Sequence, residues 1–247
     1  MTTNTSIEWT EQTWNPTTGC DKVSPGCANC YAERIAKRLK SMGAPGYENG
    51  FDLSLMKNRL EQPLARKKPT MYFVNSMSDL FHEKIPFEFI DQVFSIIQET
   101  KRHTYQILTK RSKIMHDYFI TREVPKNVWL GVSVENKRHG LPRIEDLKHI
   151  DTEVRFISCE PLLEDLGNLN LTDIHWIIVG GESGPKARIM RKEWVEAVKN
   201  QCELQDSAFF FKQWGMWGGD GVKRNKKANG RVFSGKTWSN YPVATAV

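Results

Sequence analysis

The sequence predicts an α/β protein, organised as a partial (β/α)6-type TIM-like barrel with a Gly/Trp/Lys-rich C-terminal extension. Two observations predict this fold: short apolar runs alternate with amphipathic stretches of helical period, and polar residues follow each run directly. The runs number about six, fewer than the eight of a closed barrel. With 39 % hydrophobic residues in 247, the chain has the composition of a globular protein.

The apolar runs have the length and composition of buried parallel strands. They are residues 71–74, 105–108, 128–132, 154–157, 176–179 and 208–211. Apolar residues three or four positions apart predict the intervening helices, over 87–97, through Ile114 and Tyr118, around Ile144 and Leu147, and over 193–204. Another helix is expected over 31–40, ending near Gly43. Because polar residues end each run, we expect the functional site at the carboxyl ends of the strands.

Composition changes along the chain suggest its organisation. Residues 1–214 are expected to form the partial barrel and to include the cysteine loop described below. A loop-rich insertion is expected over 41–69, which several glycines and prolines interrupt. Residues 215–247 form a basic extension, in which glycines alternate with tryptophans and cationic side chains.

The charge and the apolar pattern limit the partners. A net charge of +6 permits a polyanionic partner without requiring one. No apolar run has the length that crossing a bilayer requires, and the N-terminus lacks a charged-then-apolar signal pattern. We therefore expect a cytoplasmic protein with no membrane partner.

Three of the five cysteines, Cys20, Cys27 and Cys30, lie within eleven residues with the spacing C-x6-C-x2-C. Three thiolates on one loop suit an iron–sulfur cluster, and a fourth iron without a protein ligand would remain open to a cofactor or substrate. Zinc is the alternative, with His82 or Cys159 as the fourth ligand. The third possibility is three buried, unligated cysteines. Disulfides are disfavoured by the odd cysteine count and the expected reducing compartment.

The sequence also resembles the radical S-adenosylmethionine (radical SAM) superfamily. The resemblance is closest to a phage- and prophage-associated three-cysteine family of compact radical SAM-like proteins. It rests on seven blocks between Trp14 and Gly215: TWNPTTGC…GCANCYAE, NSMSDLFH, LTKR, VWLGVSVEN, RFISCEPLL, WIIVGGESGP and FFFKQWG. The cysteine spacing departs from the usual C-x3-C-x2-C of the superfamily.

This resemblance implies that Cys20, Cys27 and Cys30 bind a [4Fe–4S] cluster whose open iron binds S-adenosylmethionine. Reductive cleavage of that cofactor would give methionine and a 5′-deoxyadenosyl radical that abstracts hydrogen from the substrate. The expected partners include an electron donor such as flavodoxin or ferredoxin, and a separately encoded partner protein is possible.

Residue roles follow from the resemblance and from strand-end position. The residues expected to bind S-adenosylmethionine are Asn75, Ser76, Ser78, Asp79, Lys110, Ser133, Glu135, Asn136, Gly180, Gly181, Glu182 and Ser183. Among them, Asp79 is the acid expected to pair with the methionine ammonium. The catalytic candidates are Cys159 as a hydrogen-atom donor, Glu160, and Tyr31 beside the third cysteine. Nucleic-acid contacts are expected from Arg111, Lys212, Trp214, Trp217, Lys223, Arg224, Lys226 and Lys227, because cations interleaved with aromatic residues bind phosphates and stack on bases.

The favoured function is therefore a radical SAM enzyme that acts on nucleic acid, DNA rather than RNA. It would modify a base or repair a DNA lesion, by analogy with spore photoproduct lyase. Two alternatives remain: a radical SAM enzyme acting on a small molecule or peptide, and a zinc-containing nucleic-acid adaptor without enzymatic activity.

Overall fold

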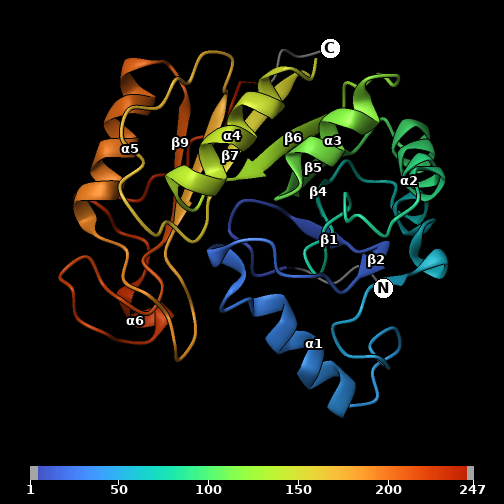
Figure 1. The fold of residues 1–247 in the computed structure, drawn as a ribbon, viewed down its shortest axis with the longest axis horizontal. Helices are drawn as coiled ribbons and strands as arrows, with labels where there is room; N and C mark the ends of the chain where they lie inside the picture. The colour runs from blue at the N-terminus through green and yellow to red at the C-terminus, as the bar shows by residue number, and fades with distance from the viewer. Residues whose placement is uncertain (1–4, 244–247) are drawn as a thin grey trace. The chain divides into compact units, whose positions relative to one another are not determined.

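The computed structural model describes residues 5–243, and within them the strands form a seven-stranded sheet and a separate two-stranded one. The larger sheet has the order β1-β4-β5-β6-β7-β8-β9 (Figure 1). Its strands are β1 (Gln12–Trp14), β4 (Met71–Val74), β5 (Thr104–Thr109), β6 (Val128–Ser133), β7 (Val154–Cys159), β8 (Trp176–Gly180) and β9 (Ala208–Gln213). The pairs β1–β4, β4–β5, β7–β8 and β8–β9 are parallel. The predicted α/β fold with a partial barrel is confirmed.

The larger sheet contains one strand more than the six predicted. Strand β1 is only three residues long, and its sequence Gln-Thr-Trp contains no apolar run that would have predicted it. It pairs with β4 in the register Gln12↔Tyr72 to Trp14↔Val74. The buried Trp14 indole anchors it further, donating from Nε1 to the carbonyl of Arg59 at 2.8 Å. This strand leads into the cysteine loop, so it positions the start of that loop.

The described chain divides into two compact units that are discontinuous in sequence. Unit 1 contains the residues up to Val23, Cys30–Leu130 and His149–Glu153. Unit 2 contains Ser24–Asn29, Gly131–Lys148 and the residues from Val154 onward. Residues 215–243 of the predicted extension are therefore grouped with the strands before them, and residues 244–247 lie outside the described residues.

Unit 1 contains α1 (Tyr31–Ser41), α2 (Phe87–Glu99) and α3 (Ser112–Phe119). Helix α2 buries five apolar residues with the predicted helical spacing: Phe89, Ile90, Val93, Phe94 and Ile97. The core of unit 1 also contains Tyr72 and Tyr105, whose rings stack with centroids 5.5 Å apart. Residues 41–69 contain the short elements β3 (Ser54–Leu55), η2 (Lys57–Arg59) and η3 (Gln62–Ala65). Strand β3 pairs in antiparallel fashion with β2 (Thr17–Thr18).

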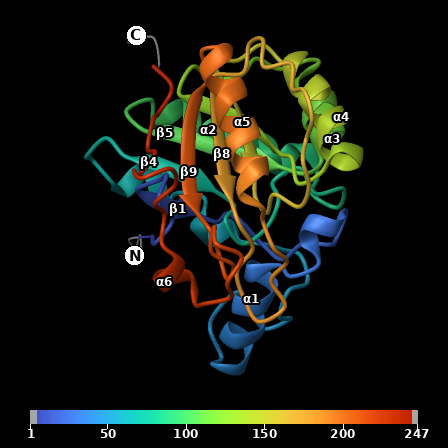
Figure 2. The same cartoon turned by 90° about the vertical axis from the view of Figure 1, so that its left-hand side faces the viewer.

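Unit 2 contains α4 (Lys137–Lys148), α5 (Lys192–Leu204), α6 (Lys226–Asn229) and the one-turn helix η1 (Pro25–Cys27). Helix α5 packs along β9 and buries Val195, Val198 and Cys202 (Figure 2). The extension folds back onto the same strand, where Phe233 and Trp238 contact Phe209 at ring-centroid distances of 6.4 and 5.9 Å. None of the helices between residues 5 and 243 combines the length and apolar character that crossing a bilayer requires.

Candidate functional site

The cysteine loop runs from Gly19 to Cys30. Gly19 has φ +84°, and a Cβ there would lie 2.2 Å from the carbonyl oxygen of Asp52, so only glycine fits this turn. Further along, the Cys27 amide donates to the Ser24 carbonyl at 3.0 Å, and Cys30 is the N-cap residue of α1. None of the three cysteines of the loop forms a disulfide, and each is partly exposed. The loop therefore presents three potential thiolate ligands without a disulfide between them.

In unit 1, a buried arginine contacts the first thiol. Arg111 Nη1 donates to Cys20 Sγ at 3.3 Å, and its Nη2 donates to the Asp21 carbonyl at 3.3 Å. Asp79 and Glu83 balance its charge, at 3.2 and 2.6 Å. Burial opposes the charged guanidinium, but the Asp79 and Cys20 charges and the hydrogen bond to Glu83 raise the pKa of Arg111 above its ordinary value. Arg111 therefore remains a fixed cation beside Cys20.

Asp79 connects the ends of β4 and β5. Its Oδ1 accepts from the Phe81 amide and the Thr109 hydroxyl at 3.1 and 2.7 Å, and its Oδ2 accepts from the Lys110 amide and from Arg111 at 3.1 and 3.2 Å. Each carboxylate oxygen thus already accepts two hydrogen bonds from protein donors. Asp79 is buried, and its hydrogen bonds indicate that it positions Arg111 and does not bind the ammonium group that the sequence predicted for it.

Arg111 was predicted to bind nucleic acid. Its side chain is only 5 % exposed, which is too buried to meet a phosphate backbone.

The polar residues after β4 hold the segment that precedes the cysteine loop. The Asn75 side chain donates to Thr17 Oγ1 at 3.0 Å, and Ser78 Oγ donates to the Thr17 carbonyl at 2.9 Å. Ser76 Oγ donates to the Asn15 side chain at 3.2 Å. The Tyr31 hydroxyl donates to the Ser76 carbonyl at 2.5 Å while its residue stays 42 % exposed. The predicted serine and asparagine cluster is thus brought together, around the base of the loop.

In unit 2, the loop residues 24–29 lie against an acid that follows β6. A Cβ on Gly26 would be 3.2 Å from Glu135 Oε1, so the loop backbone approaches this carboxylate closely. Glu135 is fully buried and pairs with Arg143 Nη1 at 2.7 Å. The same Nη1 donates to the Ser133 carbonyl at 2.7 Å. The neighbouring Asn136 accepts from the His139 amide at 2.9 Å, as an N-cap of α4 does.

A second acid, Glu182, contacts the loop through Asn29. The Asn29 amide group donates to Glu182 Oε2 at 3.0 Å, and Arg188 binds both carboxylate oxygens of Glu182, at 3.0 and 2.6 Å. Burial alone would raise the pKa of Glu182, but the hydrogen bonds from Arg188 and Asn29 keep it below its ordinary value. Glu182 is thus an ionised anchor for the loop. Sequence reasoning missed Asn29, Arg143 and Arg188, because no periodicity links them to their acidic partners.

The glycines at the end of β8 permit close packing within the protein. A Cβ on Gly181 would lie 1.9 Å from the Trp214 carbonyl oxygen, and one on Gly180 would lie 2.7 Å from Glu160 Oε1. Ser183 Oγ accepts from the Gln213 side chain at 3.3 Å. The backbone at Trp214 therefore explains why residue 181 is a glycine, and close approach of an adenine ring is not needed to explain it.

The catalytic candidates at the end of β7, Cys159 and Glu160, differ in solvent access. Cys159 is fully buried, and burial raises the pKa of its thiol well above its ordinary value. Glu160 is partly exposed, accepts from Ser158 Oγ at 3.1 Å and pairs with Lys212 at 2.8 Å. The two proposed fourth ligands of zinc lie in different surroundings. His82 Nε2 already contacts Asp21 at 3.2 Å and its Nδ1 accepts from the Lys84 amide at 3.1 Å, whereas Cys159 is held in the core.

The basic extension is mostly engaged in its own contacts. Trp214 is 5 % exposed and donates from Nε1 to the Val232 carbonyl at 2.9 Å, so its ring is not open to a base. Trp217 is partly exposed and donates to the Ala187 carbonyl at 2.8 Å. Lys223 lies over the Trp217 ring and donates to the Pro185 carbonyl. Arg224 pairs with Asp220 at 2.6 Å, and Lys226 and Lys227 form the first turn of α6.

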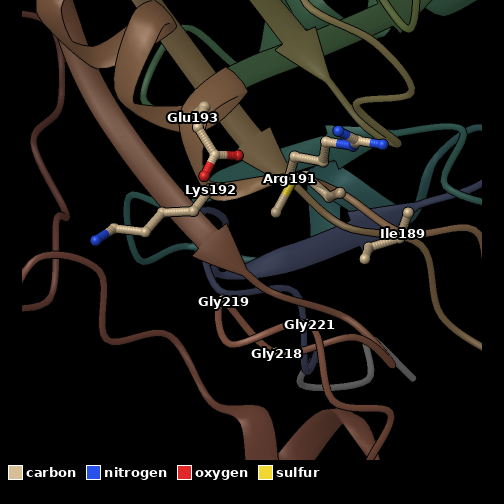
Figure 3. A pocket seen from close by; sticks show the side chains of 8 residues that line it. Ile189, Arg191, Lys192, Glu193, Gly218, Gly219 and Gly221 are labelled. Carbon is tan, nitrogen blue, oxygen red and sulfur yellow. The ribbon is translucent and has the colours of Figure 1, made fainter.

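A small hollow of about 170 Å³ in unit 2 lies where the start of α5 meets the glycines 218, 219 and 221. Figure 3 shows the Arg191 and Lys192 side chains extending in opposite directions, so these two cations do not converge on one anion. We assign no ligand to this hollow.

Residues 4–242 match the model of a family described as a protein of unknown function, DUF5131. The chain belongs to this family. No curated protein gives a significant match.

Solved structures of spore photoproduct lyase resemble this chain in fold. A spore photoproduct lyase mutant matches with a TM-score of 0.55 and 11 % identity, over 87 % of this chain and 79 % of that one. A second mutant of spore photoproduct lyase, with bound AdoMet and dinucleoside spore photoproduct, matches with a TM-score of 0.53 and 11 % identity, over the same shares of the two chains. At this identity the likeness shows a shared fold.

Proposed function

We propose that this protein is a radical SAM enzyme that binds a [4Fe–4S] cluster through Cys20, Cys27 and Cys30 and acts on nucleic acid. The observation that carries the proposal is a loop of three cysteines, none in a disulfide, whose first member accepts a hydrogen bond from the buried Arg111. Thiolates with adjacent hydrogen-bond donors are the ligands that iron–sulfur clusters use. The donor set therefore fits the cluster.

When bound, the cluster and S-adenosylmethionine would supply an electron and a 5′-deoxyadenosyl radical that abstracts a hydrogen atom from substrate. The protein's own residues fix the loop. Arg111 places a positive charge beside Cys20. The hydrogen bond from Asn29 to Glu182 fixes the loop at the residue just before Cys30. Metal centres depend on such outer contacts for the orientation of their ligands. S-adenosylmethionine contacts from the remaining strand-end residues stay part of the proposal.

Nucleic acid is the proposed substrate class. Two observations support it: the net charge of +6, and the fold shared with spore photoproduct lyase, one structure of which holds AdoMet and a dinucleoside spore photoproduct. Base modification or lesion repair in DNA is the proposed reaction, with an electron donor such as flavodoxin or ferredoxin. Glu160, partly exposed and paired with Lys212, is the catalytic candidate more open to solvent, since Cys159 is fully buried.

The test is anaerobic reconstitution of the full chain with iron and sulfide, followed by reduction and addition of S-adenosylmethionine. We expect a brown protein that forms 5′-deoxyadenosine, and stimulation of this product by DNA. Cys27→Ala should abolish both the cluster and the product. Cys202→Ala is the matched control, because Cys202 is buried on α5 outside the loop. A colourless protein that binds zinc and forms no product would contradict the proposal and favour the zinc adaptor.

A further inference from the structure

Helix α1, which begins directly after Cys30, carries a concentrated positive charge on its exposed side. Its exposed cations are Arg34, Lys37, Arg38 and Lys40, which we call the basic α1 face. Arg34 and Arg38 are four residues apart, and Lys37 is three residues from Arg34, so these three side chains project from one side of the helix. Figures 1 and 2 show α1 at the edge of its unit.

The charge of this face is largely uncompensated within residues 5–243. Glu33 is the single acid of the helix, and it pairs with Lys22 at 3.1 Å and with Lys37 at 2.6 Å. Arg34, Arg38 and Lys40 form no ion pair among the described residues. Three long cationic side chains therefore face solvent without an ion pair to an acid among the described residues.

The apolar side of α1 is already used inside unit 1. Ala32 and Ala36 pack with Tyr47 and Met77 in one buried cluster. A helix that lies on a membrane needs a wide apolar face for the bilayer, and here that face is turned inward. The partner that remains is one that binds cations, so charge complementarity favours a polyanion.

An aromatic side chain lies in the first turn of the helix. The Tyr31 residue is 42 % exposed, while its hydroxyl is fixed by the hydrogen bond to the Ser76 carbonyl. Proteins that bind single strands combine cations for the phosphates with such rings for the bases. The predicted basic extension offers less, because Trp214 is buried and Arg224 is paired with Asp220.

We propose that the basic α1 face binds the phosphate backbone of the nucleic-acid substrate, with Tyr31 stacking on a base beside the cysteine loop. This inference rests on the proposed function for its substrate, but the surface and its test are separate from the cluster chemistry. Because α1 starts at the residue after Cys30, a strand bound along it would lie next to the third thiol in the chain. The surface thus positions the substrate near the proposed reactive centre.

The test compares two neutralised double variants of the full chain. Arg34→Gln/Arg38→Gln removes two charges from the basic α1 face, and Lys67→Gln/Lys68→Gln removes two exposed charges elsewhere in unit 1. Binding to fluorescently labelled single-stranded and duplex oligonucleotides is measured by anisotropy between about 50 and 200 mM salt. We expect the α1 variant to bind at least about tenfold more weakly at low salt, with the salt slope reduced by about 0.7 to 0.9 for each lost phosphate contact. The control should bind within about twofold of the native protein, since removal of charges outside the interface changes only long-range attraction.

Other outcomes decide against the proposal. If the α1 variant and the control bound DNA equally weakly, the loss of binding would come from the change in overall charge. If only Lys226→Gln/Lys227→Gln lost binding, the interface would lie on the extension. Arg34→Lys/Arg38→Lys, which keeps the charge, should retain most of the binding, and its failure to do so in a folded protein would overturn a phosphate contact. Iron and sulfide contents are measured in parallel. A native protein without a cluster but with α1-dependent binding would refute the radical chemistry and leave this surface intact.

Discussion

Arg111 Nη1 lies 3.3 Å from Cys20 Sγ, a contact that joins residues 91 positions apart in the sequence. The arginine follows β5 and the cysteine follows β2, so the contact connects the end of a sheet strand to the first thiol of the loop. Asp79 fixes the guanidinium from a third segment, after β4. Arg111 and Asp79 form a buried ion pair, and through it the position of the partly exposed Cys20 depends on two strand ends.

The first prediction concerns this network. Arg111→Gln should decrease the free energy of unfolding by about 3–5 kcal/mol, because Asp79 would remain as a buried carboxylate without its cationic partner. In the reconstituted protein the midpoint reduction potential should fall, since a positive charge near a cluster stabilises the added electron. Denaturant unfolding and potentiometry measure the two effects.

Arg122→Gln is the control for Arg111, since Arg122 also pairs with an acid of unit 1, Asp91, at 2.7 Å. That pair is partly exposed, so its loss should cost about 1 kcal/mol or less and leave the potential unchanged. A potential that is the same in native protein and in Arg111→Gln would contradict a charge effect of Arg111 on the cluster.

The second prediction separates two adjacent glycines. Gly181→Ala should destabilise the protein by about 3 kcal/mol or more, because its Cβ would collide with the backbone carbonyl of Trp214. Gly180→Ala should cost less than about 1.5 kcal/mol, because its Cβ meets the end of the Glu160 side chain, which can rotate away. Thermal unfolding of the two variants measures the difference. Equal destabilisation would mean that the backbone contact at 181 is not limiting.

The fold was predictable where burial leaves a periodic pattern. Strand β8 is buried at every residue, and α2 buries residues at helical spacing, so both are visible as apolar patterns. Strand β1 was not predictable, because its three residues alternate between buried and half-buried positions and include a glutamine and a threonine. Its pairing with β4 is set by tertiary contacts that no local pattern contains.

The candidate site was predictable in its residue types but less so in its partners. Cysteine spacing and strand-end position brought together Cys20, Asp79 and Glu182 as candidates. Their ionic partners depend on contacts between distant segments, as for Arg111, or on local turns without periodicity, as for Arg188. Composition also treats Trp214 and Trp217 alike, although one is buried and the other is partly exposed.

The third prediction uses this difference between the tryptophans. Trp214→Ala should lose about 3–5 kcal/mol of unfolding free energy, because the ring packs between Phe211 and Phe233. Trp217→Ala should lose about 1 kcal/mol, as is common for partly exposed side chains. Urea unfolding of both variants measures the two values. A Trp214→Ala protein with native stability and weakened DNA binding would instead support the base-stacking role predicted from the sequence.

The last prediction concerns Glu182 and pH. The hydrogen bonds from Arg188 and Asn29 lower the pKa of Glu182 below its value in the unfolded chain. A carboxylate with a lowered folded pKa stabilises the native state above the unfolded pKa, near 4.3, and this contribution is lost as the pH falls through the folded pKa. Glu182→Gln should therefore be less stable than the native protein by about 2 kcal/mol at neutral pH. The difference should shrink progressively below about pH 4, because the native carboxylate then becomes protonated.

Chemical denaturation of native and variant protein across this pH range measures the difference. Glu203→Gln is the matched control in unit 2, since Glu203 pairs with Lys199 at 2.6 Å but has a side chain 54 % exposed. Exposed pairs of this kind contribute about 1 kcal/mol or less, so the control should differ little from the native protein at any pH. If the Glu182→Gln difference stayed constant down to acid pH, the stabilisation would come from the shape of the side chain. If the stability difference instead disappeared as the native Glu182 carboxylate was protonated, the charge on Glu182 would be what anchors Asn29. Through Asn29, this charge would also anchor the cysteine loop.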